Sequence, residues 1–297
     1  MTADSASMKI GYYPGCSLEG SSRDFAESLH AVCNALAIEL DEIPEWNCCG
    51  ASSGHMIDHL LSIALPINVL LKAQKAGMDQ VMAPCASCYN RLAMASHEVA
   101  SSAQTKQQVE KVLAAKIDKL PRVLNVVELL AQVGDRIAGK LAKKFEQTVA
   151  CYYGCLLVRP AKVTGFDQTE DPQEMDKLVA AVGGKTIDWS FKTECCGASF
   201  SISRTSVVGR LGAKIVEDAV NHKAEAIVVA CPMCHSNLDL RRGEINQRMD
   251  KATDIPVLFI TQVIGLALGI PGKKLGLGRH FVPVKFPAKL VTTPAVQ

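Results

Sequence analysis

Twelve cysteines in a chain of 297 residues are the part of this sequence that could do chemistry. Ten of them form two sets with one shared order, namely a single cysteine, an adjacent pair and a Cys-x-x-Cys motif. The first set is Cys16, Cys48, Cys49, Cys85 and Cys88, and the second set is Cys155, Cys195, Cys196, Cys231 and Cys234. Thiolates bind soft metals and clusters, so each set is a candidate metal or redox site. The remaining Cys33 and Cys151 are expected to be buried core residues.

The rest of the sequence argues against a secreted disulfide scaffold. The start, MTADSASMKIGYY, has neither the basic nor the apolar region of a signal peptide, so we expect a cytoplasmic protein. Disulfides are rare in that compartment, and 48% hydrophobic residues suffice for a core without them. The longest apolar stretch, Pro256 to Ile270, is too short to span a membrane. A net charge of +2 gives no reason to expect a nucleic-acid partner.

The motifs are duplicated along the chain. Cys48-Cys49-Gly50-Ala51-Ser52 recurs as Cys195-Cys196-Gly197-Ala198-Ser199, and Tyr12-Tyr13-Pro14-Gly15-Cys16 has its counterpart in Tyr152-Tyr153-Gly154-Cys155. Internal repeats indicate repeated structural units. We therefore predict two similar domains, over residues 9–140 and 147–270, related by a pseudo-twofold axis. Residues 1–8 are predicted to be a flexible N-terminus, and residues 271–297 an irregular C-terminal tail.

Apolar runs predict the elements that position the cysteines. The predicted strands are Lys9–Tyr13, Asp79–Ala83, Gln147–Tyr153 and Ala226–Ala230, each leading to a single cysteine or a Cys-x-x-Cys. The predicted helices are Met56–Ala76, kinked or split at Pro66, and Tyr89–Val99, Ser206–His222 and His235–Asn246. Strands alternating with helices predict an α/β fold with mainly parallel sheets. Ligands of such sheets lie at the carboxyl ends of the strands.

Five thiolates in each set limit the choice of metal. Structural zinc takes four ligands, which leaves one sulfur unused. An ordinary cubane cluster also takes four thiolates, usually from compact runs that this sequence lacks. Five thiolates with an adjacent pair suit a larger or less symmetric iron–sulfur cluster, while zinc and free thiols remain the alternatives. Gly50 and Gly197 would let backbone N–H groups approach sulfur. Pro84 and Pro232 suit helix starts, where the positive helix end favours anions.

The pattern C-x31–39-CC-x34–35-C-x2-C, present twice, resembles the duplicated cysteine-rich CCG domain in the B subunit of heterodisulfide reductase, over roughly residues 8 to 270. The stretch CYYGCLLVRP, from Cys151 to Pro160, is similar to that subunit in particular. The resemblance implies two Rossmann-like domains, each with one noncubane 4Fe-4S cluster held by its five-cysteine set. It also implies a substrate disulfide cleaved between the clusters by one-electron steps. The implied partners are the ferredoxin-like C subunit and the flavin-containing A subunit of such a complex.

The predicted function is that of the catalytic subunit of a heterodisulfide-reductase-like complex, which reduces or forms a disulfide, thiol or persulfide. An electron relay in another oxidoreductase and a zinc-stabilised interaction module are the alternatives. His235 follows Cys234 and is a candidate proton donor, or simply a residue at the start of a helix. Arg159 follows Cys155 closely and is a candidate anion-binding group, or part of a surface ion pair. The sequence leaves the substrate and the direction of electron flow open.

Overall fold

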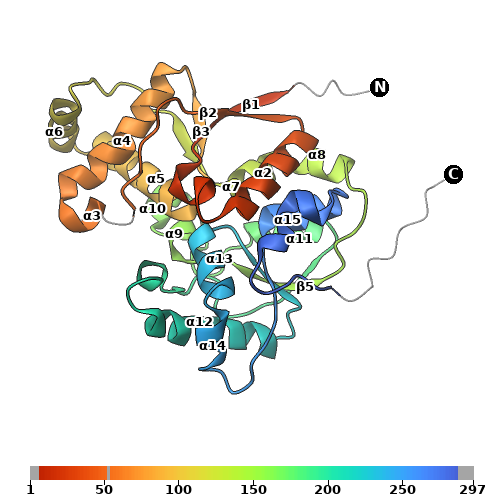
Figure 1. The fold of residues 1–297 in the computed structure, drawn as a ribbon. Coiled ribbons are helices and arrows are strands. Elements are labelled where there is room, and N and C mark those ends of the chain that lie inside the picture. The colour runs from red at the N-terminus through yellow and green to blue at the C-terminus, as the bar shows by residue number, and fades with distance from the viewer. Residues whose placement is uncertain (1–6, 52–53, 287–297) are drawn as a thin grey trace, which may run out of the picture.

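The first half of the chain folds around one parallel sheet. The computed structural model describes residues 7–51 and 54–286, and its first half lies above the second in Figure 1. In the described residues up to 139, four parallel strands lie in the order β2-β1-β3-β4. The strands are β1 (Met8–Tyr12), β2 (Ile38–Glu42), β3 (Gln80–Met82) and β4 (Arg122–Leu124). The helices are α1 (Gly15–Glu19), α2 (Arg23–Ala35), α3 (Gly54–Ile57), α4 (His59–Lys75), α5 (Ala86–Ser101), α6 (Ala103–Leu113), α7 (Val126–Gln132) and α8 (Gly134–Gly139).

The second half repeats this plan. Across residues 140–286, four parallel strands lie in the order β6-β5-β7-β8, which is the strand order of the first half. The strands are β5 (Thr148–Tyr152), β6 (Lys185–Thr186), β7 (Ala226–Val229) and β8 (Val257–Phe259). The α-helices are α9 (Cys155–Val158), α10 (Ala161–Thr164), α11 (Glu174–Ala181), α12 (Thr205–Asn221), α13 (Pro232–Asp239), α14 (Arg242–Asn246) and α15 (Ile260–Ala267). The 3-10 helices are η1 (Ala198–Phe200), η2 (Gly272–Leu275) and η3 (Leu277–Arg279).

The α/β fold with two Rossmann-like parallel sheets is thus confirmed. The central strands are apolar enough to be covered on both faces, and every residue of β7 is buried. Helix α2 buries Phe25, Leu29 and Val32 together with Cys33, which is 1% exposed as expected. Helix α4 is continuous through Pro66, so the helix expected to be kinked or split there is not split. The chain breaks instead at Asp58, whose carboxylate caps α4 by accepting a hydrogen bond from the Leu61 amide at 2.8 Å.

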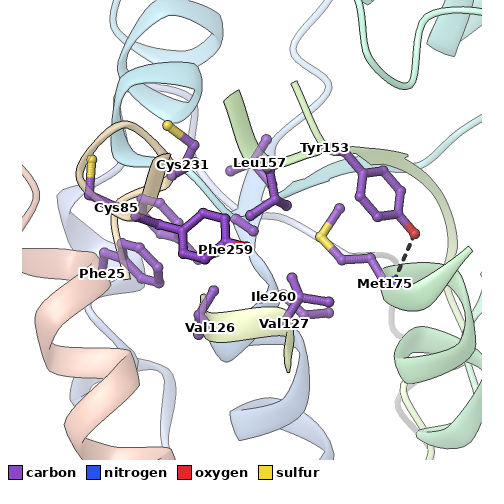
Figure 2. Close-up of a cluster of buried hydrophobic side chains, with 14 of the residues drawn as sticks. Phe25, Cys85, Val126, Val127, Tyr153, Leu157, Met175, Cys231, Phe259 and Ile260 are labelled. Carbon is purple, nitrogen blue, oxygen red and sulfur yellow. Dashed lines mark hydrogen bonds between the residues drawn. The ribbon is translucent and has the colours of Figure 1, made fainter. Parts of the chain in front are cut away.

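Helices of the two halves pack against each other in a shared core. Helix α15 of the second half packs against α2 of the first, and α7 of the first half packs against α11 of the second. Figure 2 shows this core, in which the rings of Phe25 and Phe259 stack with centroids 4.2 Å apart. The hydroxyls of Ser28 and Thr261 are 2.7 Å apart in the same contact. Helices α2 and α11 occupy equivalent places in the two halves, and so do α7 and α15. The two contacts are therefore equivalent, which is the pattern expected of a pseudo-twofold axis.

The chain after residue 270 returns to the first half. Helix η2 packs against α2 and α15, and Leu275 fills the space over Gly265, where the Leu275 methyl groups would clash with an added Cβ. The Gln262 amide donates to the Leu275 carbonyl at 3.0 Å. The first part of the expected tail is therefore ordered by packing against both halves. Its sequence has no helical or strand periodicity from which this could be predicted. Residues 287–297 of that tail, and residues 1–6 of the expected flexible N-terminus, lie outside the described residues.

Candidate metal centres

The cysteine motifs of each half follow three neighbouring parallel strands. In the first half, Cys16 lies in α1 after β1, the pair Cys48-Cys49 follows β2, and Cys85 begins the turn from β3 into α5. The second half repeats this arrangement, with Cys155 after β5, Cys195-Cys196 after β6 and Cys231 between β7 and α13. Because parallel strands end at one edge of their sheet, residues far apart in the sequence meet there.

The first set forms a connected group of sulfurs. The Cys49 and Cys88 sulfurs are 3.3 Å apart. Cys48 interacts with Cys49 and, electrostatically, with Cys16, and Cys85 interacts with Cys88. Cys49, Cys85 and Cys88 are buried, whereas Cys16 and Cys48 are exposed. The group therefore extends from the protein core to the surface.

The second set has the same form. The Cys196 and Cys234 sulfurs are 3.7 Å apart. Cys155 interacts with Cys195 and, electrostatically, with Cys196, and Cys231 interacts with Cys234. Cys195 is exposed and Cys155 half-buried, whereas the other three are buried. In each set the structure thus places one buried pair of sulfurs in contact and the other three nearby, but no three cysteine sulfurs of the described residues lie within 4.8 Å of one another.

The two sets approach each other at the core between the halves. The thiols of Cys85 and Cys231, which occupy equivalent positions, lie close enough to influence each other's pKa, raising that of Cys85 and lowering that of Cys231. Figure 2 shows both side chains beside the stacked rings of Phe25 and Phe259, with their sulfurs pointing away from the core in the same direction. The packing that joins the halves therefore also fixes the separation of the two cysteine sets.

Glycine backbone shapes both sites. Gly50 and Gly197 have the same φ of +76°, which places their amides 3.4 and 3.3 Å from the sulfurs of Cys48 and Cys195. The N–H groups predicted beside the cysteine pairs are therefore present.

A second glycine approaches each site more closely. Gly15 and Gly154 also have positive φ, and a Cβ there would lie 3.1 Å from the Cys88 sulfur and 2.9 Å from the Cys234 sulfur. A larger residue would therefore push against the Cys-x-x-Cys sulfur, in addition to its backbone strain.

Two tyrosines, which the sequence did not single out, tie the loops together. The hydroxyl of Tyr13 donates to the carbonyl of Asn47, the residue before the first cysteine pair, at 2.8 Å. Tyr152 donates in the same way to the carbonyl of Glu194, before the second pair, at 2.5 Å. Because both tyrosines precede a single cysteine closely, each bond joins two cysteine-bearing loops. Their recurrence at equivalent positions was the available signal.

Interactions between neighbouring thiols lower the pKa of some cysteines and raise that of others. Hydrogen bonds from Cys48 and then Cys88 lower the pKa of Cys49 to about 3. A hydrogen bond from Cys155 lowers the pKa of Cys195 to about 6, with help from the amides of Gly197 and Ala198. The hydrogen bond to Cys49 raises the pKa of Cys88. Each site therefore stabilises thiolate character on particular sulfurs, which is the form that binds metal.

The two candidate helper residues lie in different surroundings. His235 is buried, stacks on Phe259 with ring centroids 4.3 Å apart, and places Nε2 3.1 Å from the Val257 carbonyl. Burial lowers its pKa to about 3, which leaves it neutral and poorly suited to donate a proton. Arg159 contacts the Glu170 carboxylate and donates to the Thr193 hydroxyl at 3.1 Å, so it is held against the loop before Cys195. Both roles stay predictions.

Two Rossmann-like halves, each gathering five sulfurs at its strand ends, define a duplicated cysteine-rich protein with paired thiolate sites. The chain belongs to the family of the cysteine-rich CCG domain, whose model matches residues 10–93 and again residues 149–239. The sequence-based recognition of this duplicated domain is confirmed.

Relatives match along almost the whole chain. An 8-methylmenaquinol:fumarate reductase membrane anchor subunit of Wolinella succinogenes is 29% identical, over 92% of this chain and 97% of that protein. The B subunit of the ferredoxin/F(420)H(2)-dependent CoB-CoM heterodisulfide reductase of Methanosarcina acetivorans is 26% identical, over 95% and 97%. An Archaeoglobus profundus protein named as similar to the B subunit of heterodisulfide reductase is also 26% identical, over 90% and 93%. These relatives support an electron-transfer role within an oxidoreductase.

A solved structure shares the fold. The crystal structure of a hypothetical protein from Helicobacter pylori superposes with a TM-score of 0.68 at 11% identity, covering 95% of this chain and 53% of that chain. The chain therefore spans about half the length of that protein. Among the described residues, no helix is both long and apolar enough to cross a membrane.

Proposed function

We propose that this chain is the catalytic iron–sulfur subunit of a heterodisulfide-reductase-like complex, in which a noncubane 4Fe-4S cluster is held by each five-cysteine set. The observation that carries the proposal is that two complete five-cysteine sets lie at the strand ends of two equivalent halves, with Cys85 and Cys231 as neighbours where the halves meet. The substrate would be a disulfide, thiol or persulfide held between the two sites. The complex would be cytoplasmic, and its other members would be a ferredoxin-like protein and a flavin-containing protein.

The residues present fit such a group. Ten soft sulfur donors suit iron and sulfide better than oxygen-preferring cations. The backbone amides of Gly50 and Gly197 already point at sulfur, and hydrogen bonds of this kind stabilise the negative charge that several thiolates concentrate. The Cys88 amide, at the start of α5, donates to the Cys85 sulfur, and the Cys234 amide at the start of α13 does the same for Cys231.

The arrangement suits one-electron chemistry at two neighbouring points. When bound, the clusters would each supply or accept one electron, and two electrons convert a disulfide into two thiolates. The chain itself excludes water from one side of each site, where Cys49, Cys88 and Cys234 are buried. Cys16, Cys48 and Cys195 lie at the surface, which keeps the other side accessible to substrate and electron donors.

Iron analysis and paramagnetic resonance of anaerobically prepared protein test the proposal. We expect iron and sulfide equivalent to two four-iron clusters per chain, and a paramagnetic signal that depends on added thiol. Cys88→Ala should lose about half of the iron, whereas Cys33→Ala, which removes another buried thiol outside the sets, should retain it. Near-stoichiometric zinc with little iron would remove the iron–sulfur proposal.

A second candidate is an electron relay that does not bind thiol. The 29% identity to a fumarate reductase subunit, over nearly the whole of both chains, favours it. The relay would need the same ten cysteines, so iron content does not separate the two candidates. Resonance spectra that are unchanged by thiol, from clusters that the partner proteins still reduce and reoxidise, would favour the relay over catalysis.

A further inference from the structure

Three buried ionisable side chains from distant parts of the chain face one another outside the cysteine sets. They are Asp24 at the start of α2, His235 in α13 and His280 after η3. Their ligand atoms all lie within 4.8 Å of one another. One residue comes from each half, and the third comes from the segment that returns over the first half. The cluster therefore lies where three separate parts of the fold meet.

The donor atoms face one another without hydrogen bonds between them. Asp24 Oδ2 is 4.0 Å from His235 Nδ1 and 3.7 Å from His280 Nε2, both beyond hydrogen-bond range. Asp24 Oδ1 accepts from the Phe25 amide at 2.9 Å, which fixes the carboxylate. The His235 ring is fixed at its other nitrogen by the Val257 carbonyl, 3.1 Å away. That bond leaves Nδ1 as the free lone pair, as in metal-binding histidines whose second nitrogen donates to a carbonyl.

The surrounding charges leave Asp24 without a matching side-chain cation. Of the described basic groups, only the two histidines form ion pairs with it. Arg279 is near, but its guanidinium is held by the Glu27 carboxylate at 2.7–3.1 Å. Asp239, another buried carboxylate nearby, accepts from the amides of Phe281 and Val282. Two buried carboxylates and two imidazoles in one place favour a divalent cation, which neutralises charge that burial makes costly.

We propose that Asp24, His235 and His280 bind a divalent transition metal ion, with Zn²⁺ the best match. Two imidazoles and one carboxylate are a common zinc donor set. A tetrahedral zinc with bonds of about 2.0–2.1 Å holds its donors roughly 3.3–3.4 Å apart. The separations of 3.7 and 4.0 Å from Asp24, and the upper limit of 4.8 Å for the group, would therefore shrink by between about 0.3 and 1.5 Å as the site closes. The Gln262 amide, now 2.8 Å from His280 Nε2, would give up this bond and keep its bond to the Leu275 carbonyl.

A small cavity lies beside two of the three proposed ligands, Asp24 and His235. A space of about 220 Å³ is lined by Asp24, His235 and Asp239, together with Arg279 and Phe281. Its lining includes charged side chains, and it is large enough to hold a water molecule that could complete the coordination of the ion. The ion would join α2, α13 and the segment after η3. It would thereby link the two halves through His235, the residue directly after Cys234, whether or not a cluster is bound.

Zinc binding to the anaerobic, iron-loaded protein tests the proposal. We expect about one zinc per chain in addition to iron, and X-ray absorption at the zinc edge showing only nitrogen and oxygen neighbours. Asp24→Asn and His280→Gln should each weaken zinc binding at least about tenfold while the iron content is kept. His222→Gln, which removes an exposed histidine paired with Asp218 outside the cluster, is the matched control and should bind zinc normally.

Zinc that displays sulfur neighbours at about 2.3 Å would belong to a vacated cysteine site and would overturn the proposal. So would a protein that takes up no zinc, or uptake that neither variant changes. Asn has almost the shape of Asp, so Asp24→Asn decides the matter if His280→Gln does not fold. Iron content measured on the same samples reports the cysteine sites separately, so this result stands apart from the proposed function.

Discussion

Gly15 and Gly154 are the positions where a single atom would disturb each cysteine site most directly. We predict that Gly154→Ala lowers the iron content of the protein to about half. The new Cβ would lie 2.9 Å from the Cys234 sulfur, closer than real Cβ contacts allow, and would displace that sulfur. Iron and sulfide per chain measure the effect.

Gly165→Ala is the control for this prediction. Gly165 has a φ of +72°, close to the +67° of Gly154, but no atom lies within 4 Å of its added Cβ. It shares the backbone strain, about 1 kcal/mol, without the contact with sulfur. Equal iron loss in both variants would show that strain alone, and not the approach to Cys234, disturbs the site.

The Tyr152 hydroxyl should stabilise the site without belonging to it. We predict that Tyr152→Phe lowers the free energy of unfolding by about 1–2 kcal/mol, because the Glu194 carbonyl loses its donor. Tyr12→Phe is a suitable control, since Tyr12 is also buried but its hydroxyl makes no hydrogen bond that joins the described cysteine loops. Denaturant unfolding of both variants measures the difference, and equal losses would contradict the prediction.

The sequence predicts the grouping of the cysteines better than the contacts that hold their loops in place. The spacing of the ten cysteines was enough to assign them to two groups, and Gly50 and Gly197 were recognisable because they follow the cysteine pairs directly. The hydrogen-bond partners of Tyr13 and Tyr152 could not be predicted in this way. Asn47 and Glu194 lie 34 and 42 residues away from them, and a single hydroxyl contact produces no periodic sequence pattern. Asp24, His235 and His280 are likewise brought together only by the contact between the halves.

At the scale of the elements, the loop before Cys195 is held by one buried lysine that pairs with two carboxylates. The Lys192 side chain is 2% exposed and its Nζ lies 2.7 Å from Asp171 and 3.5 Å from Asp176. Its carbonyl accepts from the amides of Tyr153 and Gly154, which precede Cys155. This residue therefore holds two cysteine-bearing loops of the second half together.

We predict that Lys192→Met destabilises the protein by about 3 kcal/mol, because it leaves the largely buried Asp176 without its cation. The double variant with Asp176→Asn should recover part of that loss, since the unpaired charge is then gone. Lys185→Met, at a more exposed lysine in β6, is the control and should change stability by less than about 0.5 kcal/mol. Denaturant unfolding measures all three, and a double variant no more stable than Lys192→Met would argue against this explanation.

The element predictions succeed where apolar runs are long. Four strands and the main helices follow from such runs, but β2, β4, β6 and β8 did not. Strand β6 has only two residues, and β2 alternates buried Ile38 with charged neighbours at the edge of its sheet. Of the kink or split expected at Pro66, the split is absent, because the packing of the apolar helix α4 outweighs one missing hydrogen bond. Short edge strands depend on the neighbour they pair with, which the local sequence does not show.

At the scale of the molecule, the reciprocal packing of α2 with α15 and of α7 with α11 makes the halves depend on each other. We predict that Phe259→Ala lowers stability by about 3–5 kcal/mol and that both halves still unfold in a single transition. The Phe259 ring is fully buried against Phe25. Calorimetry measures both quantities, with the exposed Val112→Ala as control. Two separate transitions would show that the halves are independent domains.

The sequence predicts two similar halves, but it does not predict which helices of one half pack against the other. The repeat of the Cys-Cys-Gly motif implied equal units, whereas the contact of α15 with α2 depends on how those units turn toward each other. The segment after residue 270 shows the same limit, because Leu275 and His280 are buried by residues of both halves and have no pattern of their own.

The reciprocal helices have the geometry by which two identical protomers bind each other, except that here one continuous backbone carries both. In a dimer of identical chains, any replacement would appear on both sides of the axis at once. A single chain is free of that restriction. Equivalent positions can therefore differ, as Tyr89 and His235 do directly after the last cysteine of each set. The two cysteine sites can thus be adjusted separately while the interface that joins them stays in place.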